Sequence, residues 1–87
     1  MTYYVYMILT NHMKRNVSYV GYTNNLSKRL KAHNSSKGAK FTKGKVWKLI
    51  YFKQYSKKKI AMREEYKLKK NIKLRNKIKN SYNKVNA

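Results

Sequence analysis

The sequence predicts one domain of the α/β (α+β) class, with a central three-stranded, mainly antiparallel sheet flanked by helices in the order β-β-α-β-α. Three observations predict this class. Two stretches near the start alternate as strands do, two later stretches carry apolar residues at helical spacing, and a further strand-like stretch lies between those helices. The chain of 87 residues shows no internal repeat, so a single domain is expected.

The first two strands are predicted from alternation. In residues 1–9, Tyr, Val, Met and Leu at odd positions alternate with Tyr and Ile at even positions, all of which suit a pleated surface. In residues 17–22 the odd positions, Tyr19 and Gly21 among them, share one face. The polar, turn-rich residues 10–16 join the two strands, so a hairpin is expected.

A helix is predicted next, ending near His33. Three polar residues are candidates for its N-cap: Thr23, Asn24 and Asn25. Leu26, Leu30 and His33 fall at i, i+4 and i+7, which is one face of such a helix, and Arg29 lies at the edge of that face. The helix therefore carries both packing residues and candidate functional groups.

The second half of the chain predicts a loop, a strand and a longer helix. Residues 34–45 place glycines and serines among lysines, which is typical of a mobile basic loop. Residues 46–55 contain a third strand centred on 49–52. Ser56 can cap the longer helix, whose apolar residues extend to Ile72.

Beyond about residue 73 the chain is almost all Lys, Asn and Arg with few apolar residues. This composition predicts a frayed or short helix at best. The predicted organisation is a domain over residues 1–73 followed by a basic, Lys/Asn-rich extension over residues 74–87.

Net charge is the strongest compositional signal. The chain has 23 Lys and Arg residues against two acids, a formal charge of +21. Self-repulsion on this scale opposes compaction, so a polyanionic partner is expected. Nucleic acid fits best, because each phosphate contact releases condensed counterions without any sequence recognition. A membrane surface fits less well, because the basic residues do not line one long amphipathic helix.

Cysteine is absent, which excludes disulfides and Cys-ligated zinc. No apolar stretch approaches the roughly 20 residues that a membrane-spanning helix needs. We therefore expect a soluble, cytoplasmic protein.

The shortage of carboxylates limits the chemistry. The only acids are Glu64 and Glu65, which as neighbours on a predicted helix lie about 100° apart around its axis. Two-metal phosphoryl transfer needs several converging carboxylates, so an enzyme that acts on phosphodiesters would use one metal ion. The helical wheel favours Glu65 only slightly, and either glutamate could instead pair with a neighbouring Lys or Arg on a solvated face.

Phenols and cations on the hairpin and the following helix are further candidates. Tyr6 and Tyr19 lie on neighbouring strands, so their hydroxyls could converge, and Gly21 leaves room for a phosphate or another backbone. A phenol beside several cations and a metal would have a lowered pKa and could take a proton from water. Arg29 could stabilise a pentacovalent phosphate, with His33 nearby. Each residue also has a simpler interpretation, as core tyrosine, phosphate clamp or packed histidine.

Together these residues resemble the signature of the GIY-YIG nucleases. The resemblance is carried by Val5-Tyr6-Met7, Tyr19-Val20-Gly21, the helix with Arg29 and His33, residues 38–44 and 48–52, and residues 61–70. It runs from about Tyr3 to Lys70 and is closest to the small, single-domain UPF0213 (YhbQ-like) branch. The first triplet here is Val-Tyr-Met, so the alignment at that point depends on the tyrosine alone.

The resemblance implies roles for individual residues. It implies catalytic roles for Tyr6, Tyr19, Arg29, His33 and Glu65, with one divalent ion, Mg²⁺ or Mn²⁺, on Glu65. It leaves open which tyrosine activates the water. Larger members of the family carry separate DNA-recognition domains, and this sequence shows none, so sequence specificity should be low or be supplied by structure in the substrate.

We therefore predict a metal-dependent endonuclease acting on DNA. Branched and single-stranded DNA are candidate substrates, and RNA is an alternative partner. The residues expected to contact nucleic acid are Gly21, Lys28, Lys37, Lys40, Lys43 and Lys69. The alternative is a basic DNA- or RNA-binding protein that keeps the fold and does not cleave. A third interpretation is an RNA-associated structural protein.

Overall fold

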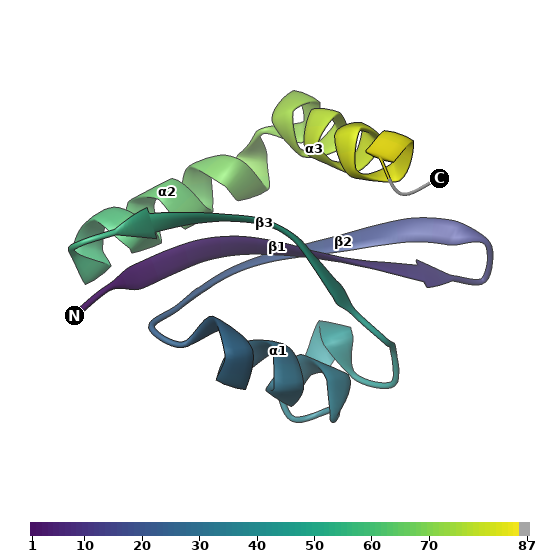
Figure 1. Cartoon of the computed structure of the whole chain (residues 1–87), viewed down its shortest axis with the longest axis horizontal. Helices are drawn as coiled ribbons and strands as arrows, with labels where there is room; N and C mark the ends of the chain where they lie inside the picture. The colour runs from purple at the N-terminus through teal and green to yellow at the C-terminus, as the bar shows by residue number, and fades with distance from the viewer. Residues whose placement is uncertain (86–87) are drawn as a thin grey trace.

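The computed structural model describes residues 1–85 and confirms the predicted α+β class. The elements are β1 (Tyr3–His12), β2 (Arg15–Thr23), α1 (Leu26–Asn34), a 3₁₀ turn η1 (Lys40–Thr42), β3 (Lys48–Tyr55), α2 (Lys58–Lys70) and α3 (Ile72–Val85). The strands form one antiparallel sheet in the order β2-β1-β3. Helices α2 and α3 lie over one face of this sheet, and α1 lies over the other (Figure 1). None of the helices within residues 1–85 has the length and apolar character needed to cross a membrane.

The central strand β1 is buried on both faces, which explains its unbroken apolar run. Val5 and Met7 pack with Ala61 and Leu68 on the side of α2. Tyr6 and its even-numbered neighbour Ile8 point the other way and pack with Trp47 and residues of α1. The sheet therefore separates two small cores, one under each helical layer.

The hairpin has the predicted faces. Tyr6 pairs with Gly21 and Ile8 pairs with Tyr19, and directly opposed residues share a face of an antiparallel sheet. Tyr6, Tyr19 and Gly21 consequently lie on the α1 side. On the other edge of β1 the register to β3 shifts between Met7 and Ile8, a bulge that re-aims the first part of β3.

Local capping sets the start of each helix. Of the three candidate caps for α1, the structure uses Asn25, whose side chain accepts a hydrogen bond from the Lys28 amide at 3.1 Å. The expectation for Ser56 is wrong: α2 begins after Lys57, without a side-chain cap. The predicted long helix also stops early, because Asn71 ends α2 and its side chain accepts from the Leu74 amide at 3.0 Å, which starts a new helix.

The C-terminal segment is the clearest correction. Instead of a frayed or short helix, residues 72–85 form the 14-residue helix α3, which crosses the expected boundary at residue 73. Ile78 packs against the core on the α2 side of the sheet. The last two residues of the predicted extension, 86 and 87, lie outside the described residues.

The basic loop is anchored at several points, although its composition predicted mobility. Asn34 accepts from the Trp47 amide at 2.5 Å and donates to the Trp47 carbonyl at 3.1 Å, which ties the two ends of the loop together. The Trp47 indole donates to the Thr42 carbonyl at 2.9 Å, and Thr42 is fully buried. The η1 turn is therefore held against the body of the protein.

Candidate active site

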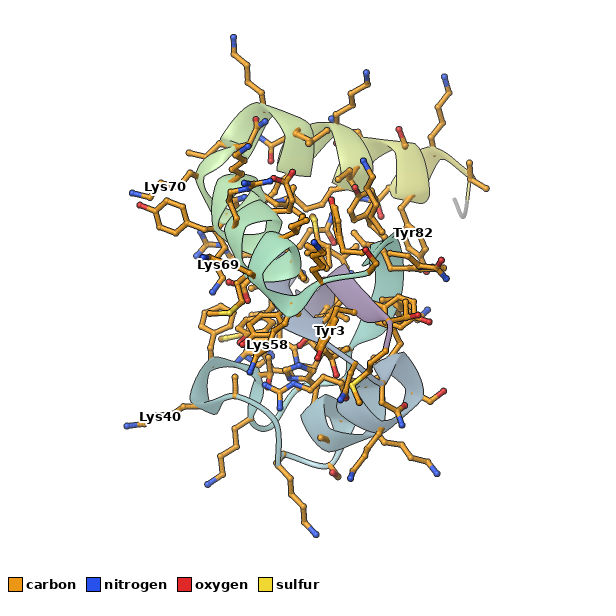
Figure 2. All side chains as sticks on the ribbon, turned by 90° about the vertical axis from the view of Figure 1, so that its left-hand side faces the viewer. Tyr3, Lys40, Lys58, Lys69, Lys70 and Tyr82 are labelled. Atoms are coloured by element: carbon orange, nitrogen blue, oxygen red, sulfur yellow. The ribbon has the colours of Figure 1, made fainter. Side chains whose placement is uncertain are left out.

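A cleft of about 420 Å³ lies where α1 and α2 both reach the outer strand β2. It is lined by Tyr3, Tyr19, Gly21, Tyr22, Thr23, Asn24, Arg29, Lys58 and Glu65. Figure 2 shows this side of the molecule, with Tyr3 and Lys58 between α2 and the half that contains α1. A larger hollow of about 460 Å³ lies between β3 and α3, but it is lined by none of the predicted site residues.

Three residues with predicted catalytic roles, from three elements, meet in this cleft: Tyr19 of β2, Arg29 of α1 and Glu65 of α2. The Glu65 side chain is only 17% exposed. Its Oε1 atom lies 3.4 Å from Lys69 Nζ, which is longer than the about 2.7–2.9 Å of a tight charge-assisted hydrogen bond. The carboxylate is therefore loosely held, and it lines the same cleft as a phenol and a guanidinium.

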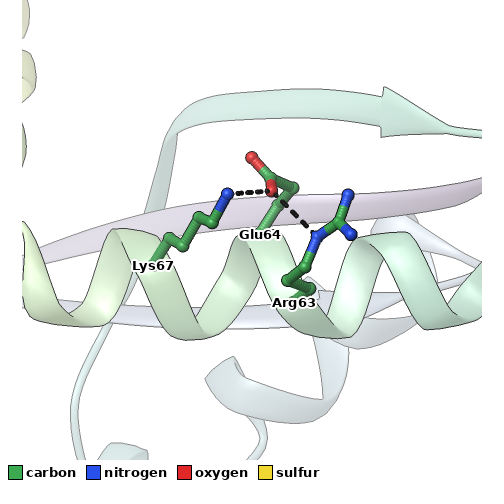
Figure 3. A network of polar contacts seen from close by, with 3 residues as sticks. All are labelled: Arg63, Glu64 and Lys67. Atoms are coloured by element: carbon green, nitrogen blue, oxygen red, sulfur yellow. Dashed lines mark ion pairs between the residues drawn. The ribbon is translucent and has the colours of Figure 1, made fainter.

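The other glutamate is placed differently. Glu64 Oε2 lies 3.6 Å from Arg63 Nε and 3.3 Å from Lys67 Nζ, and both partners are well exposed (Figure 3). Glu64 lines a separate hollow with Tyr51 and Tyr55 of β3. The two adjacent acids thus line different hollows, and of the two only Glu65 shares the cleft with Arg29.

A buried chain of hydrogen bonds connects Arg29 to the η1 turn. Thr42 Oγ1 donates to the Ala39 carbonyl at 2.9 Å, so in its 2.8 Å contact with His33 Nδ1 it is the acceptor. The imidazole proton is therefore assigned to Nδ1, and His33 Nε2 accepts from the Tyr6 hydroxyl at 2.7 Å. Tyr6 in turn accepts from Arg29 Nε at 3.3 Å. This chain fixes the orientation of the Arg29 guanidinium.

Burial controls the charge state of this chain. Desolvation raises the pKa of the Tyr6 phenol and outweighs the hydrogen bond from Arg29, which acts in the opposite direction. Desolvation, followed by the nearby Arg29 charge, lowers the pKa of His33. Arg29 thus acts on the Tyr6 pKa in the expected direction, but burial has the larger effect. Both shifts favour the neutral side chains, consistent with the proton positions assigned above.

Two glycines make room for the chain. A Cβ atom on Gly21 would lie within 3 Å of the Tyr6 hydroxyl, and a Cβ on Gly38 would clash with the His33 ring. The sequence predicted that Gly21 leaves space for a phosphate or another backbone. The structure corrects this, because the Tyr6 hydroxyl occupies that space, although Gly21 also lines the cleft.

The lysines predicted to contact nucleic acid are all exposed: Lys28, Lys37, Lys40, Lys43 and Lys69. Lys28 lines a hollow on α1 that is separate from the cleft, and Lys40 projects outward from the loop (Figure 2). Lys58, which the sequence analysis missed, lines the cleft itself. The sequence did contain a pattern that could have identified Lys58. It precedes Glu65 by seven residues and so lies on the same helical face.

Two further residues could not be found by spacing. Thr42 reaches His33 across a loop of irregular backbone, and Tyr3 approaches the cleft from the start of β1. No periodic pattern links either residue to the Arg29 helix.

The donor set fits a single hard divalent ion. Within residues 1–85 there is no group of three or more His, Cys or acidic side chains that could enclose a metal. Mg²⁺ nevertheless binds through one or two carboxylates, retains several waters and takes further ligands from substrate phosphates. Glu65, which faces an open cleft beside Arg29 and Lys58, supplies one such carboxylate.

A family model described as the GIY-YIG catalytic domain matches residues 2–83. The chain belongs to the GIY-YIG family. The matched residues include the whole cleft, the buried hydrogen-bond chain and most of α3. Membership supports a nuclease-type function for this GIY-YIG domain.

Two relatives with similar sequences agree with this membership, and one solved structure is also similar to the chain. A UPF0213 protein of Clostridium perfringens is 46% identical over 68 residues, 77% of this chain and 70% of that protein. The UPF0213 protein YazA of Bacillus subtilis is 50% identical over 58 residues, which cover 66% of this chain but only 59% of YazA. The solution NMR structure of a UPF0213 protein from Bacillus halodurans is 40% identical, covers 79% of this chain and 71% of that one, and has a TM-score of 0.44.

Proposed function

We propose that this GIY-YIG domain is a metal-dependent endonuclease that hydrolyses DNA phosphodiester bonds with one divalent ion. The observation that carries the proposal is the meeting of Tyr19, Arg29 and Glu65 in one cleft, while Glu64 points away. The formal charge of +21 supports a polyanionic substrate.

Glu65 holds the ion in this proposal. The loose pair with Lys69 leaves the carboxylate available, and Mg²⁺ or Mn²⁺ bound there would supply Lewis-acid stabilisation of charge on the scissile phosphate. Arg29 stabilises the charged transition state with its guanidinium, which Tyr6 already orients through Nε. Lys58 and the exposed lysines of the loop hold the flanking phosphates.

The proton of the attacking water has two routes. Tyr19 lines the cleft and can contact the water directly. Tyr6 is 2% exposed but has an internal acceptor for its own proton, since its hydroxyl already donates to His33 Nε2. His33 is fully buried, so it acts through Tyr6 and does not touch the substrate.

The test compares the two adjacent acids. Duplex, branched and single-stranded DNA are incubated with Mg²⁺ and with wild type, Glu65→Gln or Glu64→Gln. Because several kcal/mol of transition-state stabilisation depend on the ion, Glu65→Gln should lower the cleavage rate by at least about 100-fold. Glu64→Gln, a matched control one residue away, should stay within about twofold, because its partners are exposed surface pairs.

The outcomes separate the alternatives. Cleavage that survives Glu65→Gln would remove the metal assignment, and tight binding without cleavage of any substrate would favour the non-catalytic binding protein. In the same assay, if Tyr19→Phe lowers the cleavage rate more than Tyr6→Phe does, the water proton passes directly to Tyr19. The opposite order assigns the route through His33.

A further inference from the structure

Phe41 is an exposed aromatic residue beside the candidate active site. It belongs to η1 and is 53% exposed. Exposed apolar side chains are common, so exposure alone indicates nothing. The surroundings of this ring are distinctive: it stacks on Tyr19 with centroids 6.2 Å apart and an interplanar angle of 21°, and Tyr19 lines the cleft.

The ring is presented in a fixed position. The next residue, Thr42, is fully buried and holds His33, while the Trp47 indole donates to the Thr42 carbonyl. The Trp47 ring itself lies 6.3 Å from the Phe41 ring. Because these contacts already order the turn, a ligand that binds to Phe41 does not have to order it.

The charges around Phe41 define the kind of ligand. Lys45 Nζ lies 5.6 Å from the ring centroid, and Lys40 and Lys43 flank the ring in sequence. Lys45 Nζ also donates to the Phe41 carbonyl at 3.2 Å. An apolar protein surface would take these cations out of water, which is costly. A nucleotide suits both features, since its base can stack on the ring while its phosphate meets the lysines.

We propose that Phe41 is a stacking platform for an unpaired nucleobase, which continues the ring stack from Tyr19 and places the adjoining backbone at the cleft. The proposal rests on the proposed nuclease function and adds a substrate class to it. A base inside a duplex has both faces covered by its neighbours, so the platform selects single-stranded segments, flaps or branch points over continuous duplex.

The chain contains a matched control. Its only other phenylalanine, Phe52, is 50% exposed, which is nearly the same as Phe41. Phe52 lies on β3, with β1 between it and β2, and makes an edge contact with Tyr4 at 6.0 Å. Its removal deletes a similar exposed ring from a different part of the surface.

The experiment measures binding without cleavage. The 87-residue chain is titrated, in EDTA, into a single-stranded oligonucleotide and a blunt duplex of equal length. The versions compared are wild type, Phe41→Leu, Phe41→Trp and Phe52→Leu. Loss of one base–aromatic stack should weaken single-strand binding of Phe41→Leu by about 5- to 150-fold. Duplex binding should change less than about twofold, since phosphate contacts dominate it. Phe41→Trp should bind like wild type, and Phe52→Leu should bind both substrates like wild type.

A second measurement needs only wild type. A single-stranded oligonucleotide with 2-aminopurine should lose fluorescence on binding, because the base stacks on the ring, and a 2-aminopurine held in duplex should not. Three results would each overturn the proposal. Phe41→Leu could weaken single-strand and duplex binding equally, Phe52→Leu could weaken single-strand binding as much as Phe41→Leu does, or 2-aminopurine fluorescence could remain unquenched. These readouts do not use cleavage, so a protein that stacks bases but does not cut would refute only the nuclease function.

Discussion

The two faces of the sheet are built on different principles. On the α2 side, Val5, Met7 and Leu68 form an apolar core. On the α1 side, buried His33 and Thr42 lie among apolar residues and belong to a hydrogen-bond chain that ends at Arg29. Apolar packing depends on volume, whereas a buried polar chain depends on every donor having its acceptor. The first face therefore mainly supplies stability, and the second orients the catalytic candidate.

The largest expected effect on stability is on the apolar face. Met7 is fully buried, so Met7→Ala should lower the free energy of unfolding by about 2–5 kcal/mol through lost transfer energy and a cavity. Met7→Leu, which nearly conserves volume, should cost less than about 1.5 kcal/mol. Urea denaturation measures both. Below the unfolding transition, Met7→Ala should leave the orientation of Arg29 and the cleavage rate per folded molecule unchanged; a large loss of that rate would show that the two faces are coupled.

A smaller effect on stability is expected on the polar face, together with a change in the tautomer of His33. Thr42→Val keeps the shape but leaves the His33 Nδ1 proton without its acceptor, which should cost about 1–3 kcal/mol. The tautomer should then shift toward Nε2–H, which removes the acceptor of the Tyr6 hydroxyl. Long-range ¹H–¹⁵N NMR of the imidazole reports the tautomer directly.

The control for this variant keeps the hydroxyl. Thr42→Ser should retain the Nδ1–H tautomer and most of the cleavage rate, even though it loses a methyl group. If Thr42→Val keeps the wild-type tautomer, the donor and acceptor assignment along the chain is wrong.

The same contrast explains what the sequence could reveal. Alternation in residues 1–9 and 17–22 predicted that Tyr6 and Tyr19 share a face, because strand periodicity fixes the side on which a residue lies. Likewise, α-helical spacing placed His33 with Leu26 and Leu30. Residues linked by a regular repeat were therefore predictable.

Contacts across irregular backbone were not predictable. Thr42 meets His33 through a 3₁₀ turn that has no repeat to extrapolate. The choice between Glu64 and Glu65 was nearly even on a helical wheel, because it depends on how α2 rotates when Ala61 and Leu68 pack on the sheet. For α3, the many lysines concealed the helical spacing of Leu74, Ile78 and Tyr82, and the contact of Ile78 with the core is made only in the folded chain.

The smallest expected effect is a dependence of stability on pH that comes from the polar face alone. Burial and Arg29 hold the pKa of His33 below its ordinary value of about 6.5. As the pH falls below about 6.5, the unfolded chain takes up a proton that the folded chain resists, so the free energy of unfolding should decrease. Above that pH, His33 adds no pH dependence to the free energy of unfolding. The urea midpoint should therefore be lower at about pH 5.5 than at about pH 7.5. The other histidine, exposed His12, provides the control: His12→Gln should keep the dependence and His33→Gln should lose it. A wild-type midpoint that stays constant or rises on acidification would contradict a neutral, buried imidazole at the centre of the hydrogen-bond chain.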